Sequence, residues 1–218
     1  MSAPDAGDRA VVADLLDRAL AGRVLAPRGD GDAAGTGDTR LVCVDGLAGA
    51  GKTTLARRIA EEAARRGLGA TVVHVDDLLA GWGGLLDVGA TLARDVVAPL
   101  RAGRPGRYRR YDWLAGAFED AVTTVLPSDV VVLEGCGSAP PEVGELAALV
   151  IYVEAPDDLR LARGLARDGE EARAHWLGWM ADELRLAERD RTRERADVVV
   201  DTTAPGTTSR PDDGASPG

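Results

Sequence analysis

The chain is short of several residue types, and each shortage excludes a class of protein. Its 218 residues include two cysteines and two histidines, too few for a disulfide framework, and their spacing fits no zinc site. No structural metal is expected, and Cys43 and Cys136 are predicted to be small buried residues. No apolar run is long enough to cross a bilayer, and the first residues lack the pattern of a signal peptide. We therefore expect a cytoplasmic protein with no membrane partner.

Lysine is rarer still. The chain has 26 lysine and arginine residues against 36 acidic ones, a formal net charge of −10, and Lys52 is the only lysine. Because attraction to phosphates dominates nucleic-acid binding, no nucleic-acid partner is expected. A chain that uses arginine elsewhere has kept one flexible ammonium group, inside a glycine-rich segment, where such a group can meet the β- and γ-phosphates of a nucleotide.

What the chain does contain is an alternation of short β-rich runs and longer helical ones. The valine-rich runs alternate only weakly, as strands do when both faces of a parallel sheet are covered. We predict strands at Arg40–Asp45, Ala70–Asp76, Asp129–Glu134, Ala148–Glu154 and Ala196–Asp201. We predict helices at Asp8–Ala21, Thr53–Arg66, Thr91–Arg101, Ala117–Val125, Asp157–Arg167 and Glu170–Arg191. This order predicts a three-layer α/β domain with a five-stranded parallel sheet.

The two ends differ from the middle in composition. Residues 1–38 are predicted to form the N-terminal helix and a flexible linker rich in glycine, aspartate and proline, from about Pro27 to Asp38. Residues 39–203 are predicted to be the folded domain. The tail, 204–218, has too few apolar residues to bury and is expected to be disordered.

The glycine-rich segment fits the P-loop, or Walker A, pattern G-x-x-x-x-G-K-[ST]. A hydrophobic strand precedes it and a helix follows, which is the context that the motif requires. Its glycines let main-chain N–H groups converge on phosphates beside a positive helix N-terminus. We expect Lys52 to contact the β- and γ-phosphates and Thr53 to bind Mg²⁺ in a P-loop NTPase fold. The predicted nucleotide-binding residues of the loop are Gly46, Leu47, Ala48, Gly49, Ala50, Gly51, Lys52, Thr53 and Thr54.

Carboxylates end two of the predicted strands. Glu134 follows four apolar residues, and there it can hold Mg²⁺ directly or through water. Asp76 and Asp77 end another strand, at the edge where open α/β sheets collect their ligands. One of these two can act as the general base that takes a proton from an acceptor hydroxyl. The alternatives are a surface or helix-capping glutamate at 134 and a helix N-cap at 76–77.

Five segments in this order resemble the uridine kinase branch of the P-loop kinases, which is related to phosphoribulokinase and bacterial pantothenate kinase. The resemblance covers about Leu41 to Asp201. The segments are GLAGAGKTT, VHVDDLL, RYDW, VVLEG and LRLARGLARD. It implies an ATP-dependent kinase that requires Mg²⁺ and phosphorylates a small hydroxyl-bearing molecule.

The resemblance also implies roles for single residues. Asp76 matches the family's acid near the acceptor hydroxyl, and Tyr111 matches a tyrosine that packs near the nucleoside base. Asp77, Tyr111 and Asp112 are therefore predicted to bind the acceptor. Leu78 and Leu79 replace the family's aromatic pair, and the histidine expected after the YDW segment is absent. These departures leave the identity of the acceptor open.

Three arginines match the family's lid helix, and the predicted lid covers about 157–191. Arg160, Arg163 and Arg167 are spaced by three and four residues and so share one helix face. Arg163 and Arg167 are predicted to be catalytic and Arg160 to bind the nucleotide, by clamping the transferring phosphates when the lid closes. The alternative is a solvated helix that carries exposed Arg–Asp pairs.

Other conspicuous residues leave alternatives open. Five arginines between Arg101 and Arg110 form either a solvated loop or a site for an anionic acceptor. Trp176 and Trp179 are expected to pack in the core or lid, and His74 to be a core histidine inside a strand. Trp82 can line the acceptor pocket or lie in a mobile loop.

We therefore predict a P-loop phosphotransferase that uses Mg²⁺ and ATP to phosphorylate a nucleoside or similar small hydroxyl acceptor. Two rivals stay open: a kinase with an anionic acceptor, such as a nucleoside monophosphate or an acyl compound, and an ATPase or switch module with a protein partner. The sequence does not decide between ATP and GTP, and a homodimer is left open.

Overall fold

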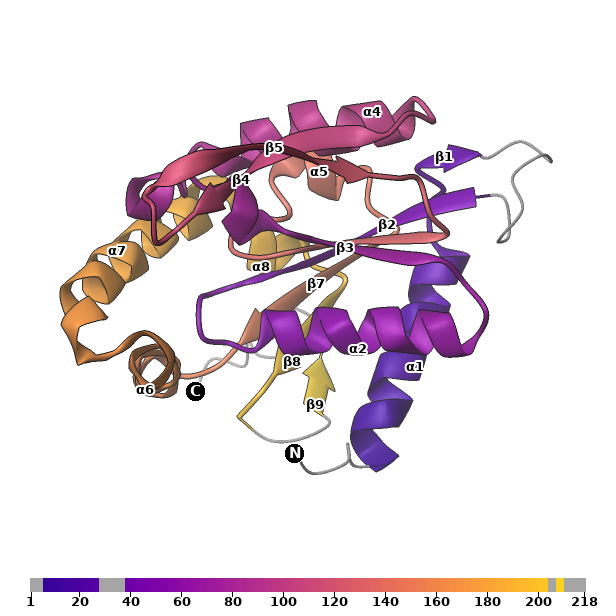
Figure 1. Ribbon diagram of the computed structural model, residues 1–218. Coiled ribbons are helices and arrows are strands. Elements are labelled where there is room, and N and C mark those ends of the chain that lie inside the picture. The colour runs from indigo at the N-terminus through magenta and orange to yellow at the C-terminus, as the bar shows by residue number, and fades with distance from the viewer. Residues whose placement is uncertain (1–5, 28–37, 204–206, 210–218) are drawn as a thin grey trace.

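A central sheet lies between two layers of helices in the computed structural model, which describes residues 6–27, 38–203 and 207–209 (Figure 1). Five of its strands are parallel, in the order β3-β6-β2-β7-β8. They are β2 (Asp38–Gly46), β3 (Ala70–His74), β6 (Val130–Glu134), β7 (Leu149–Glu154) and β8 (Val198–Asp201). Two short antiparallel strands extend the sheet, β1 (Ala26–Pro27) beside β2 and β9 (Thr207–Ser209) beside β8. The predicted α/β fold with five parallel strands is confirmed.

The strands are buried on both faces because their side chains alternate between two separate cores. Along β2, Leu41 and Cys43 enter one core, whereas Val42 and Val44 enter the other. All five side chains of β6 are buried. This explains the near-continuous apolar runs of the inner strands β2 and β6, whereas the edge strand β3 is only partly buried.

Helices α1 (Ala6–Ala21) and α2 (Lys52–Arg65) cover the first face, where they cross below the sheet in Figure 1. In α1, Leu15, Leu16 and Ala19 are almost fully buried, and they pack in the same core as Ile59 of α2. The N-terminal helix is therefore part of the packed fold that supports the P-loop helix.

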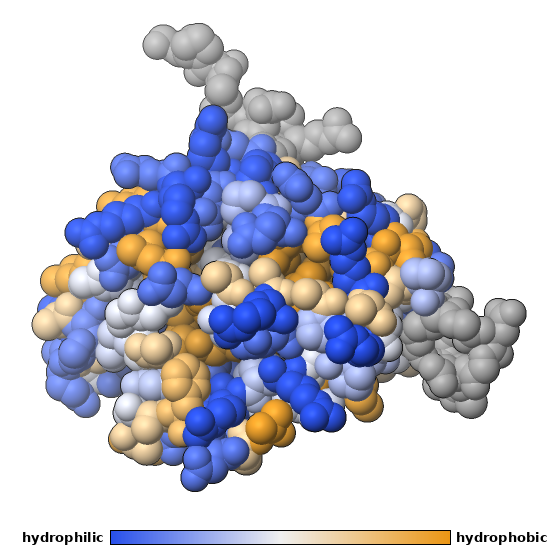
Figure 2. Space-filling model, turned by 90° about the horizontal axis from the view of Figure 1, so that it is seen from above, coloured by the Kyte–Doolittle hydropathy of each residue, from blue (hydrophilic) through white to orange (hydrophobic). Residues whose placement is uncertain are grey.

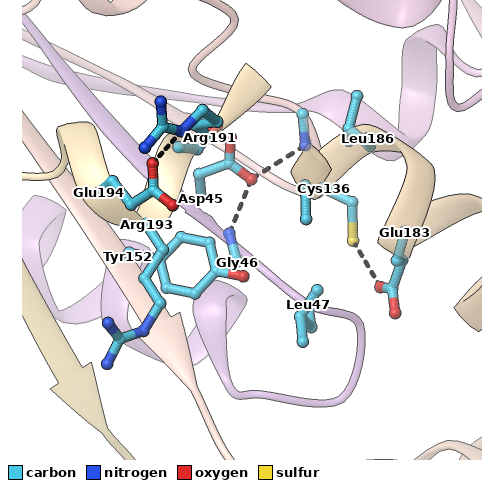
Figure 3. Close-up of a pocket in the computed structure, with 13 residues that line it drawn as sticks. Asp45, Gly46, Leu47, Cys136, Tyr152, Glu183, Leu186, Arg191, Arg193 and Glu194 are labelled. Carbon is cyan, nitrogen blue, oxygen red and sulfur yellow. Dashed lines mark hydrogen bonds and ion pairs between the residues drawn. The ribbon is translucent and has the colours of Figure 1, made fainter. Parts of the chain in front are cut away.

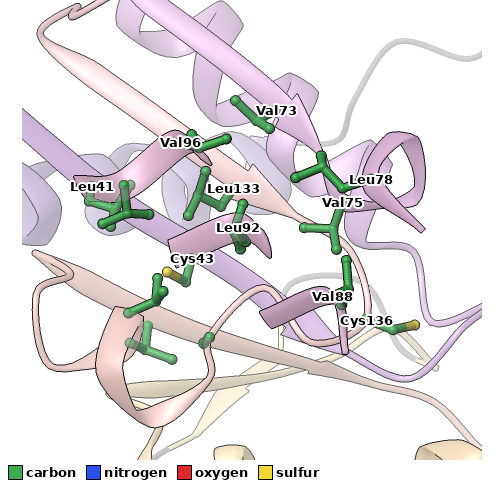
Figure 4. Close-up of a cluster of buried hydrophobic side chains, with 14 of the residues drawn as sticks. Leu41, Cys43, Val73, Val75, Leu78, Val88, Leu92, Val96, Leu133 and Cys136 are labelled. Atoms are coloured by element: carbon green, nitrogen blue, oxygen red, sulfur yellow. The ribbon is translucent and has the colours of Figure 1, made fainter. Parts of the chain in front are cut away.

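The second face is covered by a helix with an irregular middle and by two short helices. This helix comprises α3 (Val88–Leu92), one wider π turn (Ala93–Val97) and α4 (Ala98–Arg101). Its side chains Val88, Leu92 and Val96 pack on β2, β3 and β6, as Figure 4 shows. The helices α5 (Pro141–Gly144) and α8 (Thr192–Arg195) complete the layer.

Two further helices, α6 (Asp157–Asp168) and α7 (Arg173–Asp190), occupy the segment predicted from the sequence to be the lid. They follow the carboxyl end of β7 and lie at one side of the molecule, beyond the loop that joins β2 to α2 (Figure 1). Trp176 and Trp179 of α7 are buried, as the sequence predicted.

The prediction of a helix at Ala117–Val125 was wrong, because this segment is strand β5. It pairs antiparallel with β4 (Gly106–Asp112), part of the arginine-rich stretch for which the sequence suggested a loop. The apolar residues of β5 have helical spacing, but only Val125 is buried. The β-branched run from Val122 to Val125 and the pairing with β4 outweigh that pattern.

The hairpin leaves apolar side chains at the surface. The large exposed hydrophobic residues of the hairpin are Trp113, Leu114, Phe118 and Val122, and Leu126 follows directly after it. Seen from above, the molecule presents separate groups of hydrophobic residues among hydrophilic ones (Figure 2). Within the described ranges, no helix combines the length and the apolar character that a membrane span requires.

Two predictions fall largely on residues that the structure does not describe. Most of the predicted linker, residues 28–37, and most of the predicted tail, residues 204–206 and 210–218, lie outside the described ranges.

Candidate functional site

The P-loop lies between the end of β2 and the start of α2, and its backbone requires glycine at several positions. Gly46, Gly49 and Gly51 have φ angles of 135°, 77° and 101°. A Cβ atom on Gly46 would lie 2.1 Å from the carbonyl oxygen of Val153, and one on Gly49 would lie 2.5 Å from that of Arg160. The loop is therefore packed tightly between β7 and α6, with main-chain conformations that side-chain-bearing residues rarely adopt.

The end of this loop presents unpaired main-chain donors. Helix α2 begins at Lys52 without a side-chain cap. The N–H of Ala50 donates to the carbonyl of Leu47 at 3.2 Å, but no described residue accepts from the N–H groups of Gly51, Lys52 or Thr53. Such orphan donors at a helix N-terminus suit an anion with several oxygens, such as a phosphate chain.

Lys52 lies inside the loop that its motif defines. Its side chain is buried, and Nζ donates to the carbonyl of Leu47 at 2.9 Å and to Sγ of Cys136 at 3.3 Å. Burial alone would lower the pKa of Lys52, but acidic groups around it, including Asp76 and Glu183, raise the pKa above its usual value. The ammonium group is therefore positively charged and is fixed in place by its two hydrogen bonds.

The two predicted metal ligands meet at the carboxyl edge of the sheet. Oγ1 of Thr53 donates to Oε2 of Glu134 at 3.2 Å, because β2 and β6 are neighbours and end together. Magnesium is usually held by one or two protein oxygens together with phosphates and water, and this pair supplies such oxygens. The part of the chain that the structure describes contains no cluster of three or more histidine, cysteine or acidic side chains suited to a metal. The donors present therefore fit a magnesium ion that arrives with a nucleotide.

His74 joins this site, contrary to the expectation of a core histidine. Its side chain is 47% exposed, and Nδ1 contacts Oε1 of Glu134. The strand alternates here, so Val73 and Val75 point into the core and His74 points to the site. The hydrogen bond with Glu134 raises the pKa of His74, although partial burial opposes it.

The two aspartates after β3 lie in a short 3₁₀ turn, Val75–Leu78, and have different surroundings. Asp76 is open to solvent but crowded by protein atoms. This desolvation, together with the charge of Glu134, raises the pKa of Asp76, while Lys52 and Arg167 lower it less strongly. Asp76 therefore interacts electrostatically with Lys52 and Glu134. Its raised pKa suits a group that accepts a proton.

Asp77 faces the hairpin. Its Oδ2 is 3.2 Å from Nε of Arg110 and accepts a hydrogen bond from the hydroxyl of Tyr108 at 3.4 Å. Trp113 approaches from the same hairpin and donates from Nε1 to the carbonyl oxygen of Asp76 at 3.3 Å. The hairpin is thus attached to the turn that carries both acids.

Aromatic side chains line up beside these acids. Tyr111 makes edge contacts with Trp113 and Phe118, at centroid distances of 5.3 and 5.2 Å. Trp82 makes an edge contact with Trp113 at 5.6 Å and stacks on His175 of the lid at 5.3 Å. Asp112, predicted to bind the acceptor, uses Oδ1 to accept from the N–H groups of Leu114 and Ala115 and so fixes the hairpin turn.

Only one of the five arginines between Arg101 and Arg110 is bound at the acceptor side. Arg110 pairs with Asp77, whereas Arg109 donates to the carbonyls of Glu119 and Phe118 and to Asp120 within the hairpin. The other three, Arg101, Arg104 and Arg107, are exposed. These five arginines of the described chain therefore provide no cluster of unpaired cations beside the two aspartates.

The three lid arginines have different contacts. Arg160 is buried and donates to the carbonyl of Ala48, and Arg163 donates to that of Gly49 and to Thr202. Arg167 is largely exposed, pairs with Asp168 and lies over the ring of Trp176, 5.8 Å from its centroid. Of the three, Arg167 is the one whose charge acts on Asp76. Two of the three arginines on this helix face thus bind the backbone of the P-loop, whereas the third does not.

A cavity of about 250 Å³ lies beside the start of the P-loop, between β2, the loop after β6 and helices α7 and α8 (Figure 3). Asp45 forms part of its wall. This carboxylate accepts hydrogen bonds from the N–H groups of Gly46, Gly137 and Ala139, at 2.7 to 2.9 Å. Asp45 therefore ties the P-loop to the loop after β6.

Sequence reasoning missed Asp45, His74 and Glu183. Asp45 precedes the first glycine of the P-loop, but it was assigned only to the end of a predicted strand. The alternation of β3 could have placed His74 on the site. No local pattern marks Glu183, since its partners Ala48, Cys136 and Arg160 come from distant parts of the chain.

Comparisons with known proteins identify the family of this chain. A model of the phosphoribulokinase/uridine kinase family matches residues 90–192. A uridine kinase from Deinococcus deserti is 32% identical over 152 residues, which cover 62% of this chain and 72% of that protein.

Solved structures share the fold. A structure from Bacillus stearothermophilus, described as a possible uridine kinase, has a TM-score of 0.62 at 20% identity and covers 88% of this chain and 98% of its own. A D-glycerate 3-kinase from Cryptococcus neoformans has a TM-score of 0.54 at 13% identity, with 93% and 97% covered.

Proposed function

Because the chain belongs to the phosphoribulokinase and uridine kinase family of P-loop kinases, we propose that it transfers the γ-phosphate of Mg-ATP to a hydroxyl group of a nucleoside or a similar uncharged small molecule. One observation carries the proposal. Lys52, the Thr53–Glu134 pair and Asp76 converge at the carboxyl edge of the sheet, beside unpaired N–H donors. Groups suited to holding phosphate, to holding a metal ion and to accepting a proton thus lie together.

The P-loop would hold the nucleotide, with Lys52 on the β- and γ-phosphates and Thr53 and Glu134 holding the metal. Bound magnesium supplies charge neutralisation for the phosphate oxygens. Asp76 orients the acceptor hydroxyl and takes its proton as the oxygen–phosphorus bond forms and the bond to the leaving diphosphate breaks. Arg167 of the lid places a further positive charge near the reacting groups.

The uncharged acceptor is inferred from the surroundings of Asp76 and Asp77. An anionic acceptor needs free cations, but Arg110 is neutralised by Asp77 and Arg109 is held within the hairpin. The neighbouring side chains are aromatic instead, since Tyr111 and Trp82 each make an edge contact with Trp113. Aromatic faces and carboxylates recognise flat or hydroxyl-rich neutral molecules, such as the substrate named by the uridine kinase relative.

The base assignment is tested with Asp76→Asn. This change keeps the shape of the side chain but removes its basicity, so acceptor-dependent ADP formation should fall by about 10² to 10⁴-fold. The affinity for Mg-ADP should change little. Asp120→Asn, the same change at an exposed hairpin position, is the matched control.

The assay combines an acceptor screen with calorimetry of nucleotide binding. Neutral nucleosides should be phosphorylated, and nucleoside monophosphates and acyl compounds should be inert. An Asp76→Asn enzyme with the wild-type rate would remove the base, and turnover of anionic acceptors alone would overturn the substrate class.

A further inference from the structure

Helix α7 carries a buried carboxylate that the phosphotransfer chemistry does not use. Glu183 is 2% exposed and lies between the buried side chains of Trp179 and Leu186, three or four residues away on the same helix. It comes close to the P-loop in Figure 3. A buried charge destabilises the fold unless hydrogen bonds and an opposite charge compensate it. The partners of Glu183 therefore indicate its role.

These partners form a closed ring around Ala48 of the P-loop. The N–H of Ala48 donates to Oε1 of Glu183, and NH1 of Arg160 donates to Oε2 of Glu183 at 3.0 Å. The same NH1 also donates to the carbonyl oxygen of Ala48 at 2.9 Å. Both main-chain polar groups of one P-loop residue are therefore held by an ion pair from the two lid helices.

The ring has no spare capacity for a ligand. Oε1 of Glu183 also accepts from Nε1 of Trp179 at 3.1 Å and from the thiol of Cys136 at 3.4 Å. The remaining guanidinium nitrogens of Arg160, Nε and NH2, donate to Asp157 at 3.3 and 2.9 Å. Because every polar atom is engaged and both side chains are buried, neither residue is placed to touch a nucleotide.

We infer that Glu183 and Arg160 are positioning residues, which hold the first turn of the P-loop in the shape that binds phosphate. Gly49, immediately after Ala48, has a φ of 77° and packs against the backbone of Arg160. The unpaired donors at Gly51, Lys52 and Thr53 follow within five residues. A change in the backbone conformation at Ala48 would therefore change the directions in which these N–H groups point. A loop fixed before the nucleotide arrives loses less conformational entropy on binding.

This inference rests on the proposed function, since it assigns the ring to the nucleotide half of that site. It makes a prediction that a purely structural role would not make. Loss of the ring should weaken Mg-nucleotide binding and leave the KM of the acceptor nearly unchanged, because the hairpin and Asp77 lie outside the ring.

The test compares Glu183→Gln with Glu188→Gln. Both changes replace a glutamate of α7 with its amide, but Glu188 is exposed. By calorimetry with Mg-ADP, Glu183→Gln should raise the dissociation constant about tenfold or more, since a hydrogen-bonded charge pair is broken. Glu188→Gln should match the wild type, and Glu183→Asp, which keeps the charge, should recover part of the affinity.

Hydrogen exchange supplies the second measurement. Amides of the P-loop and of the start of α6 should exchange faster in Glu183→Gln, while those of β6 and α1 keep wild-type protection. Arg160→Lys removes the forked donor but keeps the charge, and it replaces Glu183→Gln if that variant does not fold. It should show the same pattern.

The outcomes separate this inference from the proposed function. If the wild type binds no Mg-nucleotide, the proposed function fails. If the wild type and Glu188→Gln bind but Glu183→Gln binds equally well or more tightly, the positioning role is overturned. A uniform rise in exchange over the whole chain would also overturn it.

Discussion

At the scale of single residues, the candidate site depends on carboxylates whose partners differ. Asp45 accepts three main-chain hydrogen bonds, Glu183 is compensated by Arg160, and Asp76 is left open to solvent. Burial raises the pKa of Asp45, although the main-chain donors oppose it, whereas desolvation by the crowded protein atoms around its exposed side chain raises the pKa of Asp76. No described residue donates a hydrogen bond to the carboxylate of Asp76, so this acid is the one that is free to accept a proton.

His74 offers a direct test of the metal site. Since Glu134 raises its pKa above 6.5, the charged form is favoured in the folded protein. The pair therefore stabilises the fold below the ordinary histidine pKa, and this effect disappears as the pH rises through the raised value. A magnesium ion on Glu134 would cancel the carboxylate charge, so Mg-ADP should lower the pKa of His74.

The measurement is an NMR pH titration of the two histidine rings with and without Mg-ADP. His74 should titrate above 6.5 in the free protein and lower in the complex, while a His175→Gln variant identifies the second signal. An unchanged His74 pKa on addition of Mg-ADP would place the metal away from Glu134.

At the scale of elements, α6 is the segment where one sequence pattern serves two purposes. Arg160 and Arg163 donate to P-loop carbonyls, whereas the charge of Arg167 lowers the pKa of Asp76. An interaction made mainly in the transition state lowers kcat when removed, whereas one that shapes the nucleotide site changes affinity.

Arg167→Ala should therefore reduce kcat about tenfold or more, with little change in the affinity for Mg-ADP. Arg163→Ala should mainly weaken nucleotide binding. Arg173→Ala, at an exposed arginine paired with Glu170, is the control and should behave as the wild type. Steady-state kinetics and calorimetry on the three variants decide the matter, and equal effects of Arg163→Ala and Arg167→Ala on kcat would contradict this division.

Secondary structure could be predicted wherever the local pattern and the tertiary packing agree. The five parallel strands and the longer helices of the two layers follow from valine runs and helical spacing, whereas the short helices α5 and α8 were not predicted. Strand β5 could not be predicted in this way, because its apolar residues have the spacing of a helix and it is stabilised as a strand by pairing with β4. Pairing between distant segments is decided outside the local sequence.

At the scale of the whole molecule, the site exists because the topology brings separate segments to one edge. Strands β3, β6 and β2 are neighbours in the sheet, so Asp76, Glu134 and the P-loop meet although the sequence separates them. The P-loop motif and the carboxylates at strand ends were therefore accessible to sequence reasoning. The ring of Glu183, Arg160 and Ala48 was not, because it joins residues up to 135 positions apart.

The measurement that tests the central claim most directly is calorimetry of Mg-nucleotide binding to the wild type and to Lys52→Ala. One nucleotide should bind per chain, only with magnesium present, and Lys52→Ala should weaken binding about tenfold or more, since a charged hydrogen bond to phosphate is lost. No binding to the wild type, or equal binding to Lys52→Ala, would contradict a phosphate-binding role for this loop.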